Sequence, residues 1–254
     1  MDYQVSVVGG GISGALAALY LGKSRVKTCL IDRGKPSQRL SNPYLGKTTS
    51  LNLSSIASLR DVGIWEDIKK NAQEFNEIYV WDAEGSSSVQ FKAEEISRND
   101  LGVIVHNNII LESIYSKLEQ ISEVTLIEEE SLKEISQDQN KIELTSDSGL
   151  RIASELLIGA DGSLSKVRDF SRIPIRTWSY EQLAIVSSVT TEVPLDKTAF
   201  QIFTDTGPIA LLPLMVGENV ASLIWSTDEA YGKKLLELSL IHISEPTRQA
   251  EISY

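Results

Sequence analysis

The sequence of 254 residues has few of the residues that build disulfide frameworks and metal sites. It contains one cysteine and two histidines. The single cysteine, Cys29, excludes a disulfide framework and suits a reducing compartment, and no His/Cys cluster has the spacing of a metal site. No uninterrupted run of about 18 apolar residues occurs, so no membrane-spanning helix is expected. An apolar strand begins almost at Met1, and we therefore expect no signal or transit peptide.

Positive charge is also in short supply. The formal net charge is −11, which argues against nucleic-acid binding through bulk charge. Hydrophobic residues make up 42% and charged residues 23% of the chain, as in ordinary globular proteins of one or two domains. These properties predict a cytoplasmic protein, with peripheral attachment to a membrane left open.

A glycine-rich turn lies close to the N-terminus. The β-branched run Val5–Val8 predicts a strand, the glycines Gly9, Gly11 and Gly14 follow with the spacing G-x-G-x-x-G, and an alanine-rich helical pattern comes next. Gly9 permits the tight turn, Gly11 lets backbone N–H groups approach a pyrophosphate, and Gly14 lets the helix pack close to the sheet. The helix N-terminus then favours an anion. This arrangement predicts an adenine dinucleotide, and it fits NAD and FAD equally.

The next strand ends in a carboxylate. Residues 27–32 predict a parallel strand that ends at Asp32, about 20 residues beyond the glycines, where a ribose-binding acid is expected. Asp32 is therefore predicted to accept hydrogen bonds from ribose hydroxyls. The alternative is that Asp32 only caps the turn formed with Arg33 and Gly34.

A second glycine-containing turn follows another apolar strand. Residues 155–159 predict a strand of the parallel sheet, which ends in Gly-Ala-Asp-Gly and leads into a short helix carrying Arg168. Asp161 would then lie at the carboxyl end of the strand, where ligands of such sheets bind. Taken alone, Asp161 and Gly162 fit a simple Asp-Gly turn better.

Periodicity and turn residues predict the remaining elements. A polar loop is expected from Arg33 to Gly46. The predicted helices are 48–62 and 107–121, and the predicted strands are 78–81, 88–91, 124–127, 132–136, 141–145, 150–153, 184–189, 198–203, 209–212 and 220–225. We interpret the four strands from 124 to 153 as a β-meander inserted into an α/β domain.

Together, the two turns resemble those of flavin-dependent aromatic monooxygenases of the para-hydroxybenzoate hydroxylase type. In that family the first glycine motif is followed by an Asp-Gly motif that ends in Ser-x-x-Arg, and Asp161, Gly162, Ser165 and Arg168 match it here. The resemblance implies that these residues contact the pyrophosphate side of FAD and take part in NAD(P)H binding.

Further segments resemble the branch of this family that hydroxylates intermediates of ubiquinone biosynthesis. The resemblance runs from residue 3 to about residue 237, and the segments that carry it are 47–52, 63–65, 102–107, 207–214 and 221–225. It implies that Lys47 contacts the cofactor, although the family usually has arginine there, which has a planar fork for bidentate contacts. His106 replaces a usual acidic residue. The family's third flavin motif, a Gly-Asp followed by Ala-Ala-His or similar, is absent.

The resemblance implies that NAD(P)H reduces FAD and that O₂ forms a C4a-hydroperoxyflavin, which hydroxylates the ring of a polyprenyl phenol. This chemistry needs no metal and no nucleophilic side chain, and we name no catalytic residue. His106 has no G-x-S-x-G partner for a hydrolytic triad. Two alternatives stay open: another FAD oxidoreductase on the same scaffold, such as a halogenase or a prenyl reductase, and a non-catalytic dinucleotide-binding module.

The expected architecture is a Rossmann-like α/β FAD-binding domain, residues 1–75 and 98–172, with a β-sheet substrate domain, residues 76–97 and 173–237, facing the flavin. The apolar inner face of this sheet fits a substrate pocket and an ordinary sheet core equally well. Residues 238–254 resemble the in-frame translation of a transposase-based sequencing adaptor, and we expect them to be a non-native tail. Residues 239–243 would otherwise fit a natural strand. Because of this tail, we expect the natural chain to be longer and to be cut here near Glu237. Because the third motif is missing, we expect the chain as given to bind flavin weakly or not at all and to have no turnover.

Overall fold

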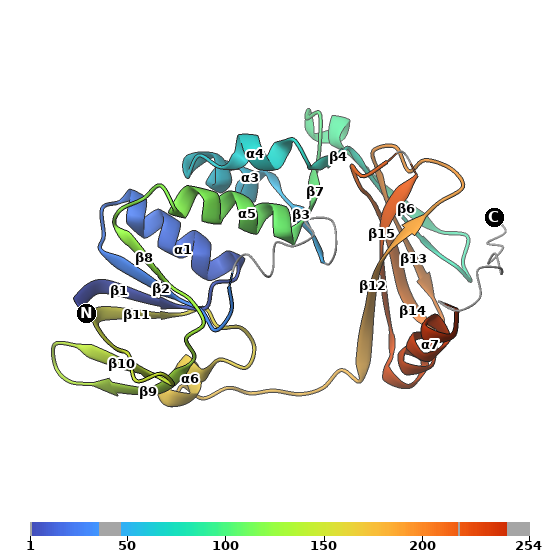
Figure 1. The fold of residues 1–254 in the computed structure, drawn as a ribbon. Helices are drawn as coiled ribbons and strands as arrows, with labels where there is room; N and C mark the ends of the chain where they lie inside the picture. Colours follow the sequence, from blue (N-terminus) through green and yellow to red (C-terminus); the bar gives the residue numbers. More distant parts are fainter. Residues whose placement is uncertain (1, 36–46, 218, 243–254) are drawn as a thin grey trace. The chain divides into compact units, whose positions relative to one another are not determined.

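A computed structural model describes residues 2–35, 47–217 and 219–242 of the chain. The predicted loop from Arg33 to Gly46 and the end of the predicted tail, residues 243–254, therefore lie largely outside the described residues. The chain divides into two compact units, Met1–Glu74 with Gly102–Arg176, and Phe75–Leu101 with Thr177–Tyr254 (Figure 1).

The first unit is built on a six-stranded sheet of order β8-β2-β1-β11-β10-β9. The strands β1 (Asp2–Val8), β2 (Thr28–Ile31) and β8 (Val124–Ile127) pair in parallel. All four residues of β2 are buried, as expected for a strand covered on both faces. The predicted β-α-β unit is confirmed, because α1 (Ile12–Lys23) connects β1 to β2.

The predicted β-meander is only partly correct. The strands β9 (Leu132–Gln137), β10 (Ile142–Ser146) and β11 (Arg151–Gly159) do follow one another as antiparallel neighbours. However, β8 pairs with β2 instead, and β11 is one strand where the sequence predicted two. Because β11 also pairs in parallel with β1, the inserted strands β9 and β10 extend the main sheet.

One face of this sheet carries the largest hydrophobic core. The helices α1 and α5 (Asn107–Leu118) pack side by side on it (Figure 1), and their buried side chains meet those of β1 and β2. The helices α3 (Leu53–Asp61) and α4 (Trp65–Lys69) add to the same core. On the opposite face, a smaller core includes Val167 of α6 (Lys166–Phe170).

The predicted helix 48–62 is wrong over its first four residues. Thr48–Leu51 forms the strand β3, which pairs antiparallel with β7 (Gly102–His106) in a small sheet that also contains β4 (Gln73–Phe75). The helix begins only after Asn52, whose side chain accepts a hydrogen bond from the backbone N–H of Ser55 at 2.9 Å. Pairing with a strand distant in sequence therefore outweighs the helical pattern.

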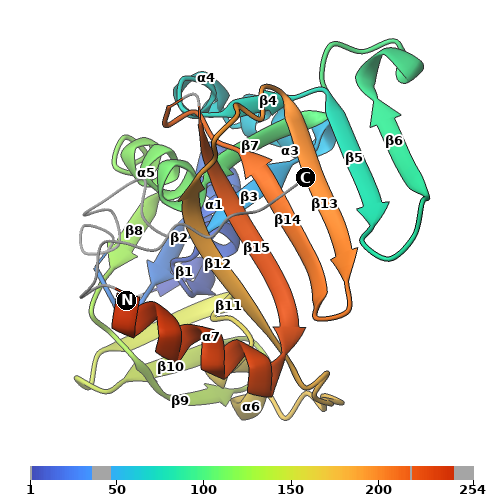
Figure 2. The same ribbon diagram turned by 90° about the vertical axis from the view of Figure 1, so that its right-hand side faces the viewer.

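The second unit contains the other six-stranded sheet, of order β12-β15-β14-β13-β5-β6 (Figure 2). The hairpin predicted from residues 78–91 is confirmed as β5 (Glu77–Asp82) and β6 (Ser88–Lys92), and a 3₁₀ helix, η1 (Ala93–Ile96), follows it. The other four predicted strands are also present and join the hairpin through the pairing of β13 with β5. They are β12 (Gln182–Thr190), β13 (Thr198–Thr204), β14 (Gly207–Pro213) and β15 (Val220–Asp228).

The last described element is the helix α7 (Glu229–His242). The sequence analysis missed this helix, and residues 239–242 do not form the strand that their alternation allowed. Within the described ranges, no helix combines the length and the apolar character needed to cross a bilayer.

Candidate dinucleotide-binding site

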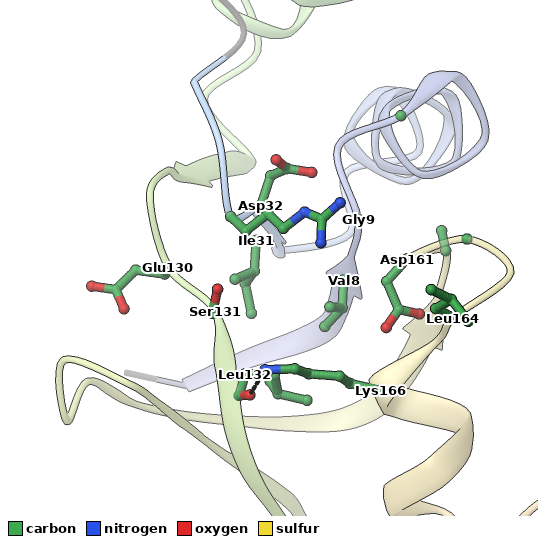
Figure 3. Close-up of a pocket in the computed structure, with 14 residues that line it drawn as sticks. Val8, Gly9, Ile31, Asp32, Glu130, Ser131, Leu132, Asp161, Leu164 and Lys166 are labelled. Atoms are coloured by element: carbon green, nitrogen blue, oxygen red, sulfur yellow. Dashed lines mark hydrogen bonds between the residues drawn. The ribbon is translucent and has the colours of Figure 1, made fainter.

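A pocket of about 350 Å³ lies in the first unit, where β1, β2 and β11 end (Figure 3). Carboxyl ends of parallel strands are the usual ligand position in open α/β sheets. The pocket brings together residues that are far apart in the sequence, including five of the predicted site residues, Gly9, Gly11, Asp32, Asp161 and Gly162. Its remaining lining residues are Val8, Ile31, Arg33, Glu130, Ser131, Leu132, Ala160, Leu164 and Lys166.

The three glycines of the first turn have different surroundings. Gly9 has φ +109°, and a Cβ on it would lie 2.3 Å from the carbonyl oxygen of Ala160. A Cβ on Gly14 would lie 1.9 Å from the carbonyl oxygen of Gly9. Around Gly11, by contrast, no atom lies within 4 Å of the Cβ position. Gly9 and Gly14 therefore allow close packing within the protein, whereas Gly11 leaves open space beside the backbone.

That open space adjoins the N-terminus of α1. Gly11 is the N-cap residue of this helix, with an extended backbone, and no side chain caps the helix end. The first backbone N–H groups of a helix have no intrahelical partner and carry a partial positive charge. A diphosphate group fits this position by charge and by the space that Gly11 leaves.

Asp32 stands at the end of β2 and holds the glycine turn. Its Oδ2 accepts a hydrogen bond from the backbone N–H of Gly10, and its Oδ1 accepts one from the N–H of Gly34 at 2.8 Å. The bond to Gly34 matches the alternative prediction, in which Asp32 caps the turn formed with Arg33 and Gly34. A carboxylate has about four lone-pair sites, so these bonds are compatible with the predicted ribose contact.

The Asp161 motif builds the start of α6. One carboxylate oxygen of Asp161 accepts a hydrogen bond from the Ser165 hydroxyl, and the other accepts one from the backbone N–H of Val167 at 3.2 Å. The Ser165 hydroxyl in turn caps the backbone N–H of Arg168 at 3.1 Å. Gly162, with φ +89°, turns the chain at the edge of the pocket. The side chains thus hold the loop whose backbone lines the pocket.

Gly14 and Ser165 do not line this pocket, and neither do three charged or titratable residues singled out from the sequence. Arg168 donates a hydrogen bond to the carbonyl oxygen of Ser163 at 2.9 Å and faces a second hollow of about 250 Å³. Lys47 is exposed, and its carbonyl accepts a bond from the N–H of Asn107 at 2.9 Å. His106 is buried at the N-cap of α5, and burial lowers its pKa.

The sequence analysis missed two residues that shape the site, Tyr115 and Lys166. Tyr115 donates a hydrogen bond from its hydroxyl to the carbonyl oxygen of Gly10 at 2.9 Å. Lys166 crosses the floor of the pocket and donates to the carbonyl oxygen of Leu132 at 3.0 Å (Figure 3). Tyr115 could have been noticed as a hydroxyl among the apolar residues of a helix, since a buried Tyr hydroxyl usually finds a partner.

The fold and the site define an α/β protein with the architecture of a dinucleotide-binding domain, in which the N-terminus of the first helix opens onto the pocket. Comparison with known sequences narrows this class. The profile of the family described as FAD binding domain matches residues 2–232. The chain belongs to this family, and its expected cofactor, FAD, fits the glycine turn and the pocket described above.

Individual relatives match along nearly the whole chain. The mitochondrial ubiquinone biosynthesis monooxygenase COQ6 of Rattus norvegicus is 30% identical over 93% of this chain and 52% of its own length. The 3-demethoxyubiquinol 3-hydroxylase of Escherichia coli is 29% identical over 98% of this chain and 62% of its own. The chain therefore spans about half to three fifths of these relatives.

A solved structure has the same fold. The crystal structure of PqsL, a probable FAD-dependent monooxygenase from Pseudomonas aeruginosa, superposes with a TM-score of 0.79 at 16% sequence identity. It covers 93% of this chain, which spans 64% of PqsL. At this identity the similarity establishes the fold alone.

Proposed function

We propose that this chain is part of an FAD-dependent monooxygenase that hydroxylates the aromatic ring of a polyprenyl phenol on the route to ubiquinone. The match to COQ6 along 93% of the chain carries this proposal. The E. coli relative, which by its name hydroxylates 3-demethoxyubiquinol, agrees with this proposal. NAD(P)H serves as the reductant and O₂ as the oxygen donor in the proposed reaction.

The first unit would hold the cofactor through the predicted residues. The N-terminus of α1 beside Gly11 would bind the diphosphate, and the carboxylate of Asp32 would bind a ribose hydroxyl. Asp161 would act indirectly, because both its oxygens fix the loop that carries Gly162 to the pocket. When bound, FAD supplies the redox and oxygen chemistry, and the protein supplies position and electrostatics.

Lys47 and Arg168 stand apart from this pocket, so we propose a different role for them. Both are cations, Lys47 exposed and Arg168 partly buried. Such side chains suit the phosphates of FAD beyond the adenosine half, or those of NAD(P)H. Neutral variants of either residue are expected to raise KM for NAD(P)H or to reduce flavin retention.

The second unit, residues 76–97 and 173–237 in the predicted division, would bind the substrate. Its sheet carries an aromatic cluster in which the ring of Phe200 lies 6.3 Å from those of Tyr79 and Trp81. These side chains are only partly buried within the unit. An apolar, aromatic surface suits a prenylated ring.

Because a polyprenyl phenol resides in lipid, we also propose that the whole enzyme works at the surface of a membrane. Sedimentation of the protein with liposomes of zwitterionic phospholipid would test this attachment. Recovery in the supernatant at low and high salt would contradict it.

The decisive experiment uses the natural protein that includes this chain and the remainder that its relatives possess. A yellow protein that releases FAD on denaturation and oxidises NAD(P)H faster when a prenylated phenol is added supports the proposal. Flavin without stimulation by phenols would favour another oxidoreductase on this scaffold. A colourless protein that cannot be loaded with FAD would contradict every flavoenzyme interpretation.

The chain of 254 residues serves as a comparison in the same experiment. We expect it to retain little FAD and to show no turnover, since it lacks a counterpart of the third flavin motif. Stoichiometric FAD after gel filtration would show that the first two motifs suffice for binding.

A further inference from the structure

We propose that Tyr115 is a positioning residue for the dinucleotide, which sets the position of Asp32 by holding Gly10 between them. The inference rests on the proposed function, because it concerns how the same pocket recognises its ribose. It assigns a role to a residue of α5 that lies outside both glycine-containing motifs.

A short chain of hydrogen bonds joins the three residues. Tyr115 is 6% exposed, and its hydroxyl donates to the carbonyl oxygen of Gly10 at 2.9 Å. The backbone N–H of Gly10 donates to Oδ2 of Asp32. One residue of the glycine turn is therefore fixed from both sides, by α5 through its C=O and by the end of β2 through its N–H.

Packing around Gly10 leaves this residue little freedom. A Cβ on Gly10 would lie 2.3 Å from the Tyr115 hydroxyl oxygen and 3.0 Å from both Cβ and Oδ2 of Asp32. Tyr115 and Asp32 therefore lie so close to Gly10 that a side chain at this position would collide with them. A shift of the turn would therefore also displace the Asp32 carboxylate, which accepts the hydrogen bond from the N–H of Gly10.

Loss of the Tyr115 hydroxyl leaves the carbonyl of Gly10 without this donor in a buried position. A buried polar group that loses its partner is destabilised, and the backbone relaxes to find another. Here such relaxation moves Gly10 and, through its N–H, the Oδ2 of Asp32. Ribose recognition then suffers more than the binding of the rest of the ligand.

The test compares ADP with 2′-deoxy-ADP on the natural, longer protein that includes this chain, freed of flavin, using ligand-observed NMR or calorimetry. Only ADP offers the 2′-hydroxyl that an acid in the position of Asp32 recognises. Tyr115→Phe removes one oxygen atom and keeps the ring. Tyr20→Phe is the matched control, because the Tyr20 hydroxyl donates to the carbonyl oxygen of Ser58 at 2.8 Å, away from the pocket.

We expect Tyr115→Phe to weaken ADP binding by about five- to tenfold, as one hydrogen bond would, and 2′-deoxy-ADP binding by less than about twofold. Tyr20→Phe should leave both affinities and their ratio unchanged. An equal loss for both ligands in Tyr115→Phe would show a merely structural role and overturn the inference, as would unchanged binding of both. If the unaltered natural protein binds no ADP, or binds ADP no more tightly than 2′-deoxy-ADP, the proposed ribose site itself fails, and the positioning role fails with it.

Discussion

Two alanine substitutions in the glycine turn should have opposite effects on binding and stability. At Gly11 the Cβ position is empty and the backbone has φ −71° and ψ 178°, values that any residue adopts. Gly11→Ala should therefore change the free energy of unfolding by no more than about 0.5 kcal/mol. Its methyl group would occupy the space through which a diphosphate approaches the backbone.

The binding penalty at Gly11 follows from the hydrogen bonds that the methyl group would block. A hydrogen bond to a charged group contributes about 1.5–3 kcal/mol. Loss of one such bond to the diphosphate corresponds to roughly 10- to 100-fold weaker ADP binding. Adenosine, which lacks phosphate, should bind Gly11→Ala about as well as it binds the unaltered chain.

Gly14→Ala is the matched comparison within the same turn. Its Cβ would lie 1.9 Å from the carbonyl oxygen of Gly9 and 3.0 Å from Cβ of Ala160, so the backbone must move by about 1 Å or more. Such overpacking costs about 1–3 kcal/mol of stability. The loss should appear in urea unfolding followed by circular dichroism.

The two variants together test the reasoning. Undiminished ADP binding by Gly11→Ala would show that the diphosphate does not approach at this turn. Stability of Gly14→Ala equal to that of the unaltered chain would show that the close contact with Gly9 is not a constraint.

Three further predictions concern other residues of the first unit. Asp32→Ala in the natural, longer protein should weaken FAD loading by about 1–3 kcal/mol, measured by fluorescence titration, and unchanged affinity would count against the ribose contact. Asp161→Asn replaces one acceptor by a donor opposite the Ser165 hydroxyl or the Val167 N–H, so hydrogen exchange of the Val167 amide should accelerate. Equal exchange rates would show that Asp161 does not anchor the start of α6. Burial lowers the pKa of His106 from its ordinary 6.5, so the unfolded state takes up the proton first and the free energy of unfolding should fall as the pH falls through about 6.5. His106→Gln should reduce this dependence of stability on pH, and an unchanged dependence would show that His106 does not cause it.

The β1-α1-β2 unit could be predicted from the sequence because its signals are local. The apolar run, the glycine spacing and the carboxylate of Asp32 lie within about 30 residues and describe one βαβ unit. The hairpin of β5 and β6 was equally local, with alternating strands around Glu84 and Gly85. In both cases the residues that determine the structure contact each other directly.

The errors concern elements whose partners are distant in sequence. Thr48–Leu51 was predicted as the first turn of a helix, but it pairs with residues 103–106, more than 50 positions away. Similarly, β11 was divided in two, although it is one strand whose residues 151–154 pair with β10 and whose residues 153–159 run along β1. Periodicity within a short window contains no information about such partners.

The site shows the same distinction at the level of single side chains. Gly9, Gly11 and Gly14 could be assigned from spacing, yet spacing cannot reveal that Gly10 is the residue held between Tyr115 and Asp32. It presents Asp161 as a ligand contact, and it does not reveal that the carboxylate also holds the loop through Ser165 and Val167. A motif therefore identifies which backbone approaches the cofactor, and the tertiary structure identifies which side chains keep that backbone in place. Tyr115, 105 positions from Gly10, belongs to this second group, and its effect on ribose discrimination separates the two kinds of contribution.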